Sequence, residues 1–365
     1  FSKPKFSNLI ITKNNRNLFN KKNSLHILCN SENLYLNKNN KNNLINWLID
    51  NKKIVFKNKP IFVVEIISSP GSISNDFIYV LNKNKIKLNK DYFLIFSPRK
   101  DWSINEFNLN KIRSFWSSNL KATNKFKQVL EITGDKTYEV KNLKNLEVLS
   151  NLDSSISHVS NMLINQLSKS YNELNFYDII NDYNYIYQKN IKFSTIGSRG
   201  VRMPHSSLNL YNGSQNSEIN TILKESIFTD FSLYKNILSQ AITLNPKKVG
   251  ILGLGYSDSN TYEGISPSLE IYKGLIIEKI NVKLNDPKVS KKDYQELSDV
   301  SFFKFPNGLG EFDMVILASD NDEYSSISWN NLKKYIKPKV IIDTTGIWSK
   351  FPWSTINTKY LLISN

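Results

Sequence analysis

Cysteine is almost absent from this sequence, because Cys29 is the only one among 365 residues. A single thiol excludes an intrachain disulfide and gives no indication of a secreted, disulfide-stabilised fold. One histidine, His26, lies near it, which is too few ligands for zinc. We therefore expect no metal site.

Glycine is absent from the first seventy residues, and Gly71 is the first one along the chain. A dinucleotide-binding unit needs Gly-x-Gly-x-x-Gly directly after its first strand, because only glycine lets the backbone approach the pyrophosphate. The N-terminal region therefore lacks the usual cradle for NAD, and we expect no cofactor. The later pair Gly253-x-Gly255 lacks the third glycine and is typical of a tight turn from strand to helix.

Long hydrophobic runs are also missing. The longest, at residues 61–64 and 249–254, fall far short of the ~20 residues that a membrane span requires. No membrane span is expected. The hydrophobic content of 40% and the aromatic content of 12% indicate a folded chain, and its length suits two or three domains.

Acidic residues are few relative to basic ones, since 48 Lys and Arg stand against 32 Asp and Glu and give a net charge of +16. Such an excess favours a polyanionic neighbour such as RNA or an anionic membrane. A solvated basic surface is the alternative. The candidate polyanion contacts lie in the Asn/Lys-rich N-terminal segment and in a glycine-containing loop: Lys21, Lys22, Arg199 and Arg202.

The last third of the sequence alternates between strand and helix patterns, which is the signature of an α/β domain. Ser266 is expected to cap a helix that has Pro267 at its first position. Strands are expected at 248–254, 280–284, 314–318 and 340–343, and helices at 266–279 and 328–335.

Upstream, the patterns are shorter and more often interrupted. Apolar residues recur every three or four positions from 145 to 190, which predicts one long helix, and 223–244 predicts another. Residues 191–215 contain several Gly and Pro residues and favour an irregular loop. Strands at 25–28, 60–67 and 92–96 and a helix at 44–49 with Trp47 facing inward complete the expected elements.

These patterns predict an α/β protein of two Rossmann-like domains joined by a central helical region, with the N-terminal domain eroded. The expected boundaries are 1–140 for the degenerate N-terminal nucleotide-binding-like domain, 141–245 for the central helices and 246–365 for the C-terminal domain.

Five ordered segments carry a resemblance to a known family: 253–256 (GLGY), 265–270 (ISPSLE), 285–287 (NDP), 313–324 (DMVILASDNDEY) and 341–344 (IIDT). Together they resemble the C-terminal UDP-binding domain of UDP-glucose/GDP-mannose dehydrogenases. More weakly, 65–72 and 91–98 look like two strand ends of that family. The segment from Asn165 to Asn181 is similar to the family's central dimer helix, which implies that a homodimer can form through it.

The resemblance also implies a residual nucleotide pocket at Gly253, Gly255, Tyr256, Ser266, Asp320 and Asp343. An Asp at the end of a strand commonly accepts hydrogen bonds from loop amides. For Asp343 we therefore favour a fold-stabilising role over that of a ligand.

Family members oxidise a sugar alcohol twice with NAD through a cysteine thiohemiacetal, which requires a thiolate. In this sequence the corresponding stretch, 197–207, contains no cysteine. Ser206 or Ser207, close to His205, is a conceivable replacement, but adjacency in sequence does not make a triad. The resemblance matches other family site positions with residues that lack the required groups: Ile67, Arg99, Asn165, Lys169, Ser257 and Gly264. We expect no catalytic residues.

We therefore favour a non-catalytic subunit of a larger assembly with other proteins and RNA, for instance a mitochondrial ribonucleoprotein in the matrix. A chain that begins with Phe1 rather than Met is compatible with a processed precursor. Two alternatives stay open. One is a divergent, cytoplasmic UDP-glucose/GDP-mannose dehydrogenase of sugar-nucleotide metabolism, and the other is a sugar-nucleotide-binding module without chemistry.

Overall fold

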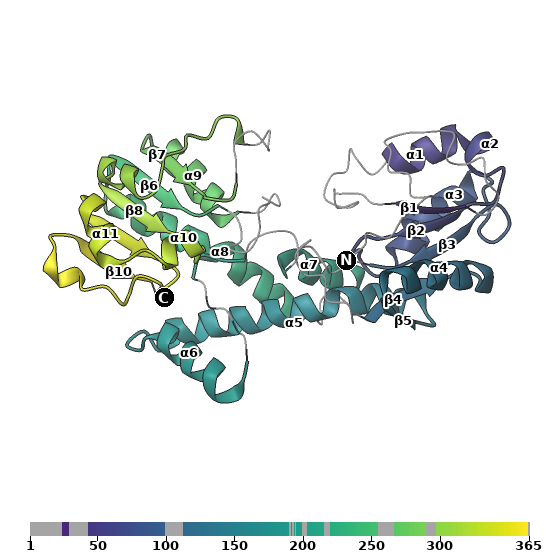
Figure 1. Ribbon diagram of the computed structural model, residues 1–365, viewed down its shortest axis with the longest axis horizontal. Helices are drawn as coiled ribbons and strands as arrows, with labels where there is room; N and C mark the ends of the chain where they lie inside the picture. Colours follow the sequence, from purple (N-terminus) through teal and green to yellow (C-terminus); the bar gives the residue numbers. More distant parts are fainter. Residues whose placement is uncertain are drawn as a thin grey trace. The chain divides into compact units, whose positions relative to one another are not determined.

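The structure is a computed structural model that describes residues 24–28, 43–98, 112–189, 191, 193, 195–198, 203–214, 220–254, 266–289 and 297–363. Lys21, Lys22, Cys29, Arg199, Arg202, Gly255 and Tyr256 lie outside these ranges. The chain divides into two compact units, Phe1–Asn151 and Leu152–Asn365 (Figure 1). None of the described helices combines the length and hydropathy that a membrane crossing requires.

The first unit is built on a five-stranded sheet. Its strands are β1 (Leu25–Leu28), β2 (Ile61–Val64), β3 (Phe93–Phe96), β4 (Ile112–Ser117) and β5 (Lys136–Glu139). Their spatial order follows the sequence, β1-β2-β3-β4-β5. The pairs β1–β2, β2–β3 and β4–β5 are parallel, and β3–β4 is antiparallel. All four residues of β2 are buried, as expected of a parallel strand that is covered on both faces.

Short helices cover this sheet: α1 (Asn43–Asp50), α2 (Lys52–Val55), the π-helix η2 (Ile73–Ile78), α3 (Tyr79–Lys83) and α4 (Leu120–Thr133). The predicted strands at 25–28, 60–67 and 92–96 and the helix at 44–49 are therefore confirmed. Trp47 is half-buried against the core of this unit. Strands β4 and β5 and helix α4 were not predicted.

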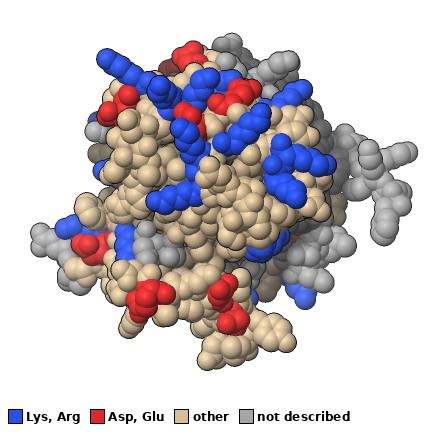
Figure 2. Space-filling view, turned by 90° about the vertical axis from the view of Figure 1, so that its left-hand side faces the viewer, with Lys and Arg blue, Asp and Glu red and all other residues tan. Residues whose placement is uncertain are grey.

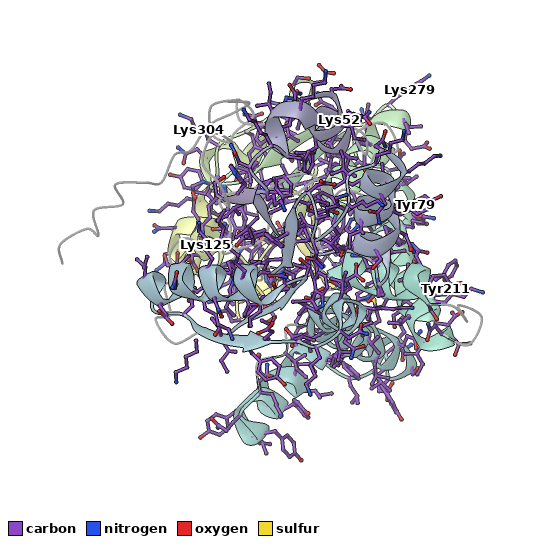
Figure 3. All side chains as sticks on the ribbon, turned by 90° about the vertical axis from the view of Figure 1, so that its right-hand side faces the viewer. Lys52, Tyr79, Lys125, Tyr211, Lys279 and Lys304 are labelled. Carbon is purple, nitrogen blue, oxygen red and sulfur yellow. The ribbon has the colours of Figure 1, made fainter. Side chains whose placement is uncertain are left out.

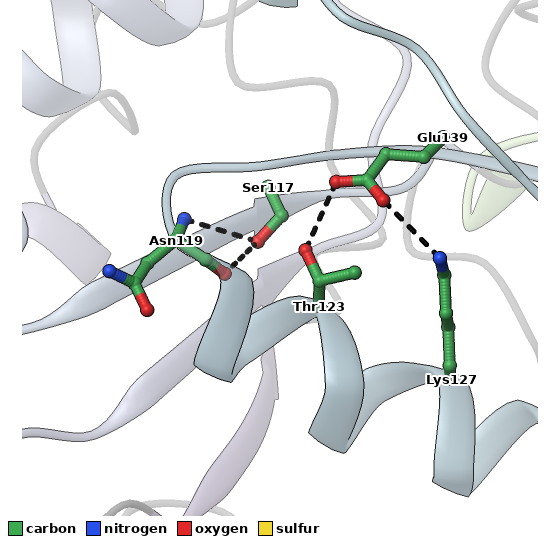
Figure 4. Close-up of polar contacts among 5 residues, drawn as sticks. All are labelled: Ser117, Asn119, Thr123, Lys127 and Glu139. Carbon is green, nitrogen blue, oxygen red and sulfur yellow. Dashed lines mark hydrogen bonds and ion pairs between the residues drawn. The ribbon is translucent and has the colours of Figure 1, made fainter.

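Helix α4 is capped at both ends and contacts β5 through polar side chains (Figure 4). The Asn119 side chain accepts a hydrogen bond from the Lys121 backbone N–H and caps the helix, and Gly134 closes it in the left-handed conformation. Glu139 on β5 accepts hydrogen bonds from Thr123 at 3.1 Å and from Lys127 at 3.3 Å.

The central helical region contains two helices where the sequence predicted one. Helix α5 (Leu143–Ser170) ends before a turn, and α6 (Phe176–Tyr187) begins after Asn175, whose side chain accepts a hydrogen bond from the Tyr177 N–H. The expected dimer helix at 165–181 is therefore wrong as a single element, because this cap restarts the helix while the apolar spacing continues through the turn.

The irregular loop expected at 191–215 is also wrong in part, because α7 (Met203–Gly213) is a helix. Pro204 lies in its first turn, where the missing N–H costs no intrahelical hydrogen bond. Helix α8 (Thr221–Thr243) confirms the helix predicted at 223–244.

The second sheet contains β6 (Lys248–Leu252), β7 (Asn281–Asn285), β8 (Met314–Leu317), β9 (Val340–Asp343) and β10 (Lys359–Leu362). All pairs are parallel and the order is β10-β9-β8-β6-β7. Around it lie α9 (Pro267–Ile277), η6 (Asn307–Glu311), α10 (Asp322–Ser325), α11 (Trp329–Tyr335) and η7 (Trp353–Thr355). This confirms the predicted α/β domain, including Ser266 as the cap of α9. The structure adds Ser328 as the cap of α11. Strand β10 was missed.

Candidate functional site

The order in which strands are added to the C-terminal sheet reverses at β6. The chain places β7 on one side of β6 and then β8 on its other side. In open parallel sheets, ligands bind beyond the carboxyl ends of the strands at such a switch point. Gly253 follows β6 there with φ +100°, and a Cβ added to it would lie 2.1 Å from the Ser319 Cβ. Only glycine therefore permits this approach of β6 to the end of β8.

Hydrogen bonds within the domain fix the position of Leu254 at this crevice. The Leu254 N–H donates to Asp286 at 2.8 Å, and the Ser266 hydroxyl donates to the Leu254 carbonyl at 2.7 Å. Ser266 also accepts from the Leu269 N–H at 3.3 Å, so that one side chain both caps α9 and closes the loop.

Two buried hydroxyls near this switch point have no hydrogen-bond partner among the described residues: Ser268, in the first turn of α9, and Ser319, directly after β8. They are free to donate to a ligand, and the N-terminus of α9 favours an anion. The exposed carboxylates that follow β8, which include Asp320, oppose an anion there. Gly255 and Tyr256, the remaining predicted pocket residues, lie outside the described chain.

Among the described residues, Asp343 accepts its hydrogen bonds from the C-terminal domain. Its Oδ1 accepts from the Thr345 N–H and hydroxyl and from the Gly346 N–H, each at 2.8 Å. Its Oδ2 accepts from the Trp348 N–H at 3.1 Å and the Tyr360 hydroxyl at 2.7 Å. The carboxylate is fully buried, so its contacts are those of the structural acceptor favoured from the sequence.

The conceivable serine nucleophile contacts a different histidine from the one considered in the sequence. Ser207 shares a 2.8 Å hydrogen bond with His158 of α5, not with His205. The other ring nitrogen of His158 lies 3.3 Å from Asp230 of α8, without hydrogen-bond alignment. Ser207 and His158 are fully buried and Asp230 is 5% exposed, so the Ser207 hydroxyl cannot meet a substrate in this arrangement.

This Ser207–His158–Asp230 chain instead ties three helices and a loop together. The other carboxylate oxygen of Asp230 accepts from the Ser198 N–H at 2.6 Å. Gly197, with φ +107°, lies against the same carboxylate, and a Cβ there would be 3.3 Å from it. Asp230 therefore positions the start of the loop in which the family places its cysteine.

In the first unit, Glu147 of α5 is buried in the turn that precedes η2. Its oxygens accept from the N–H groups of Gly71 at 2.6 Å and Ile73 at 2.8 Å, and from two serine hydroxyls at 3.4 Å. Burial raises the pKa of Glu147, while these four donors act to lower it. The carboxylate therefore takes up backbone N–H groups at the N-terminal end of η2.

A dinucleotide site in this first unit requires a switch point next to β1. The described strands run in sequential order with β1 at the edge of the sheet. Within the residues that the structure describes, no strand lies beyond β1, so the described part of this sheet forms no switch point beside it.

Sequence reasoning missed Glu147, His158 and Asp230 as members of polar clusters. A signal was available, because polar residues recur on α5 at helical spacing and lie on one face. They are all buried: Glu147, Ser150, Asn151, Ser155, His158, Asn165 and Ser168. The prediction had followed the apolar residues of the same helix.

Comparison with known proteins shows what the C-terminal domain is similar to. Residues 250–350 match the UDP binding domain of the UDP-glucose/GDP-mannose dehydrogenase family. The chain is 24% identical over 178 residues to UDP-glucose 6-dehydrogenase of Rickettsia prowazekii, which is 46% of this chain and 41% of that enzyme. The enzyme of Rickettsia typhi gives 23% over the same length. The chain thus spans about two fifths of these relatives.

Solved structures share the fold over a longer stretch. UDP-D-ManNAc dehydrogenase from Pyrococcus horikoshii superimposes with a TM-score of 0.73 and 16% identity, over 94% of this chain and 82% of that one. The UDP-N-acetyl-mannosamine dehydrogenase Cap5O from Staphylococcus aureus gives 0.67 and 19%, over 87% and 76%. At these identities the likeness shows the fold alone.

Proposed function

We propose that this chain, in which residues 250–350 match the UDP binding domain of the UDP-glucose/GDP-mannose dehydrogenase family, is a non-catalytic structural subunit of a larger assembly that contains RNA. The observation that carries the proposal is the strand order of the first sheet. With β1 at its edge, the described sheet has no switch point beside β1 for a nicotinamide cofactor. Without a hydride acceptor, neither oxidation of a sugar alcohol can take place.

The loop that carries the family's thiol supports the same proposal. No cysteine is present between residues 197 and 207, and the two serines at its end are at most 1% exposed. Covalent capture of an aldehyde requires an accessible and activated nucleophile. Neither Ser206 nor Ser207 meets the first requirement.

The exposed face of α5 supports a role as a subunit. Large apolar side chains at helical spacing are exposed there: Leu152 at 42%, Ile156 at 57%, Leu163 at 55% and Leu167 at 39%. The same helix buries polar residues on its other side. An apolar stripe of this kind marks a protein interface, and our sequence prediction of a homodimer through the central helix assigns it to a second copy.

The test is made on the full-length chain in two arms. In the first, NADH is titrated and its fluorescence is followed, and UDP-glucose and NAD are then supplied together. We expect no saturable binding at micromolar concentrations and no NADH production. Turnover would overturn the proposal in favour of a divergent dehydrogenase of sugar-nucleotide metabolism.

In the second arm, the tagged chain is purified from its own cells and sedimented with and without ribonuclease. We expect it in a large particle with other proteins, and we expect ribonuclease to shift that particle. Recovery only as a free homodimer would contradict the subunit role. The proposal places the assembly in the mitochondrial matrix, which imaging of the tagged chain tests, and a cytoplasmic signal would refute that placement.

A further inference from the structure

The amino edge of the C-terminal sheet carries a row of lysines. Because all five strands are parallel, their first residues lie along one edge. Six exposed lysines either begin a strand or precede one by no more than three residues: Lys247, Lys248, Lys279, Lys337, Lys339 and Lys359. We call this set the lysine edge.

Backbone hydrogen bonds establish that these positions are neighbours. The Asn281 N–H donates to the Lys247 carbonyl at 3.1 Å, and the Lys359 N–H donates to the Lys339 carbonyl at 2.8 Å. Between them, Asp313 links Lys248 to Lys339 by bonds of 2.9 and 2.8 Å. With ~4.8 Å between adjacent strands, the row extends for about 19 Å.

Two acidic residues of this edge already accept hydrogen bonds within the domain. Glu311 accepts a hydrogen bond from Lys283 at 2.8 Å, and that bond together with the charges of Lys283 and Lys248 lowers its pKa. Asp313 accepts from the N–H groups of Lys247 and Lys248, each at 3.0 Å. Glu278, at the end of α9, is an exposed carboxylate next to Lys279.

Carboxylates are more frequent at the opposite edge of the same sheet. After β7 and β8 come those of Asp286, Asp320, Asp322 and Glu323. The described lysines there include Lys288 and Lys350, whose Nζ donates to the Ser325 carbonyl at 3.3 Å. Figure 2, which faces the end of the structure where the C-terminal sheet lies, shows Lys and Arg side chains gathered over its upper part.

We propose that the lysine edge binds the phosphate backbone of RNA. A row of cations about 19 Å long matches a linear polyanion better than a single phosphate group, since a nucleic acid strand presents several charges over that length. Exposed asparagines at positions 245, 281 and 357 flank the lysines and supply amides for sugar and base edges. The inference deepens the proposed function, because it names the surface by which the subunit contacts RNA.

An anionic membrane is the competing partner, and the structure provides a way to separate the two. Ile276 and Ile277, which are 46% and 76% exposed, lie beside Lys279 at the end of α9. Insertion into lipid would use these side chains, whereas phosphate contacts would not. A variant at Ile277 therefore distinguishes membrane binding from RNA binding.

The experiment uses the full-length chain and a fluorescent single-stranded RNA of about 20 nucleotides, with affinity measured across a salt series. The test variant is Lys248→Gln/Lys339→Gln/Lys359→Gln. The matched control is Lys52→Gln/Lys53→Gln/Lys57→Gln, which removes the same charge from exposed positions in the first unit; Lys52 is labelled in Figure 3. Circular dichroism confirms that both variants fold.

With ~0.7 counterions released per phosphate contact on a single strand, loss of three contacts lowers the slope of log affinity against log salt by about 2. Affinity near 0.1 M salt should fall on the order of 100-fold. The control should keep the wild-type slope, and Ile277→Ser should keep wild-type RNA affinity. Equal losses in both triple variants, or binding to phosphatidylserine vesicles but not to RNA, would overturn the proposal. Failure to bind RNA without any NADH turnover would refute this surface alone and leave the non-catalytic assignment standing.

Discussion

Asp343→Ala is expected to destabilise the C-terminal domain severely. The carboxylate is fully buried and accepts five hydrogen bonds, from three backbone N–H groups, the Thr345 hydroxyl and the Tyr360 hydroxyl. Alanine removes every acceptor and leaves these donors unpaired. A buried donor without a partner costs about 1–3 kcal/mol, but such costs do not add fully when they share one site.

The expected loss in the free energy of unfolding is therefore about 3–5 kcal/mol, comparable to removing one partner of a buried ion pair. Tyr360→Phe provides the control. It removes one donor while the ring keeps its stack on Trp353, with centroids 4.8 Å apart and an interplanar angle of 5°. This variant should lose about 1 kcal/mol.

Urea unfolding followed by tryptophan fluorescence measures both variants, and hydrogen exchange at Trp348 reports the same region locally. If Asp343 served a ligand instead, Asp343→Ala would unfold near the wild-type midpoint. That result, or equal losses in the two variants, would refute the reasoning.

Three further predictions concern α5, β1 and the turn before η2. Ile156→Asp/Leu163→Asp should convert a homodimer to a monomer, since burial of each apolar side chain contributes about 1.5–3 kcal/mol; light scattering decides, and a monomeric wild type contradicts it. His26 has its pKa lowered to about 4 by burial and by Lys125. The unfolded chain therefore takes up the proton first, so the free energy of unfolding falls as pH drops from about 6.5 towards 4. His26→Gln should make the free energy of unfolding less dependent on pH in this range. Parallel plots of unfolding free energy against pH for the variant and the wild type would argue against it. Glu147→Gln places an amide against a backbone donor and should cost about 1–3 kcal/mol, visible as faster hydrogen exchange at Gly71 and Ile73, while unchanged exchange would exclude this role.

The C-terminal domain was readable from the sequence because its elements carry local signals. Ser266 and Pro267 mark a helix start, and strands such as 340–343 are short apolar runs whose burial in a parallel sheet needs no alternation. Strand β10 was missed because its residues are only partly buried at the sheet edge.

The first unit was harder, because its order depends on contacts distant in sequence. Strand β4 pairs antiparallel with β3 across the segment 99–111, which no local pattern announces. The position of β1 at the edge likewise follows from pairing and not from its own four residues. On α5, the apolar spacing indicated the helix correctly but not which face is buried.

Helix α5 has a practical consequence for anyone producing this chain. The buried face of α5 depends on directional polar contacts such as His158–Ser207. Filling that face with leucine, as one would for an ordinary helix packed on an apolar core, would therefore damage the fold. Its outer leucines, by contrast, face solvent in an isolated chain and invite aggregation during recombinant expression. Lysine at those outer positions should raise the soluble yield while abolishing partner recognition, so that the best-behaved purified material would also be the least informative about assembly.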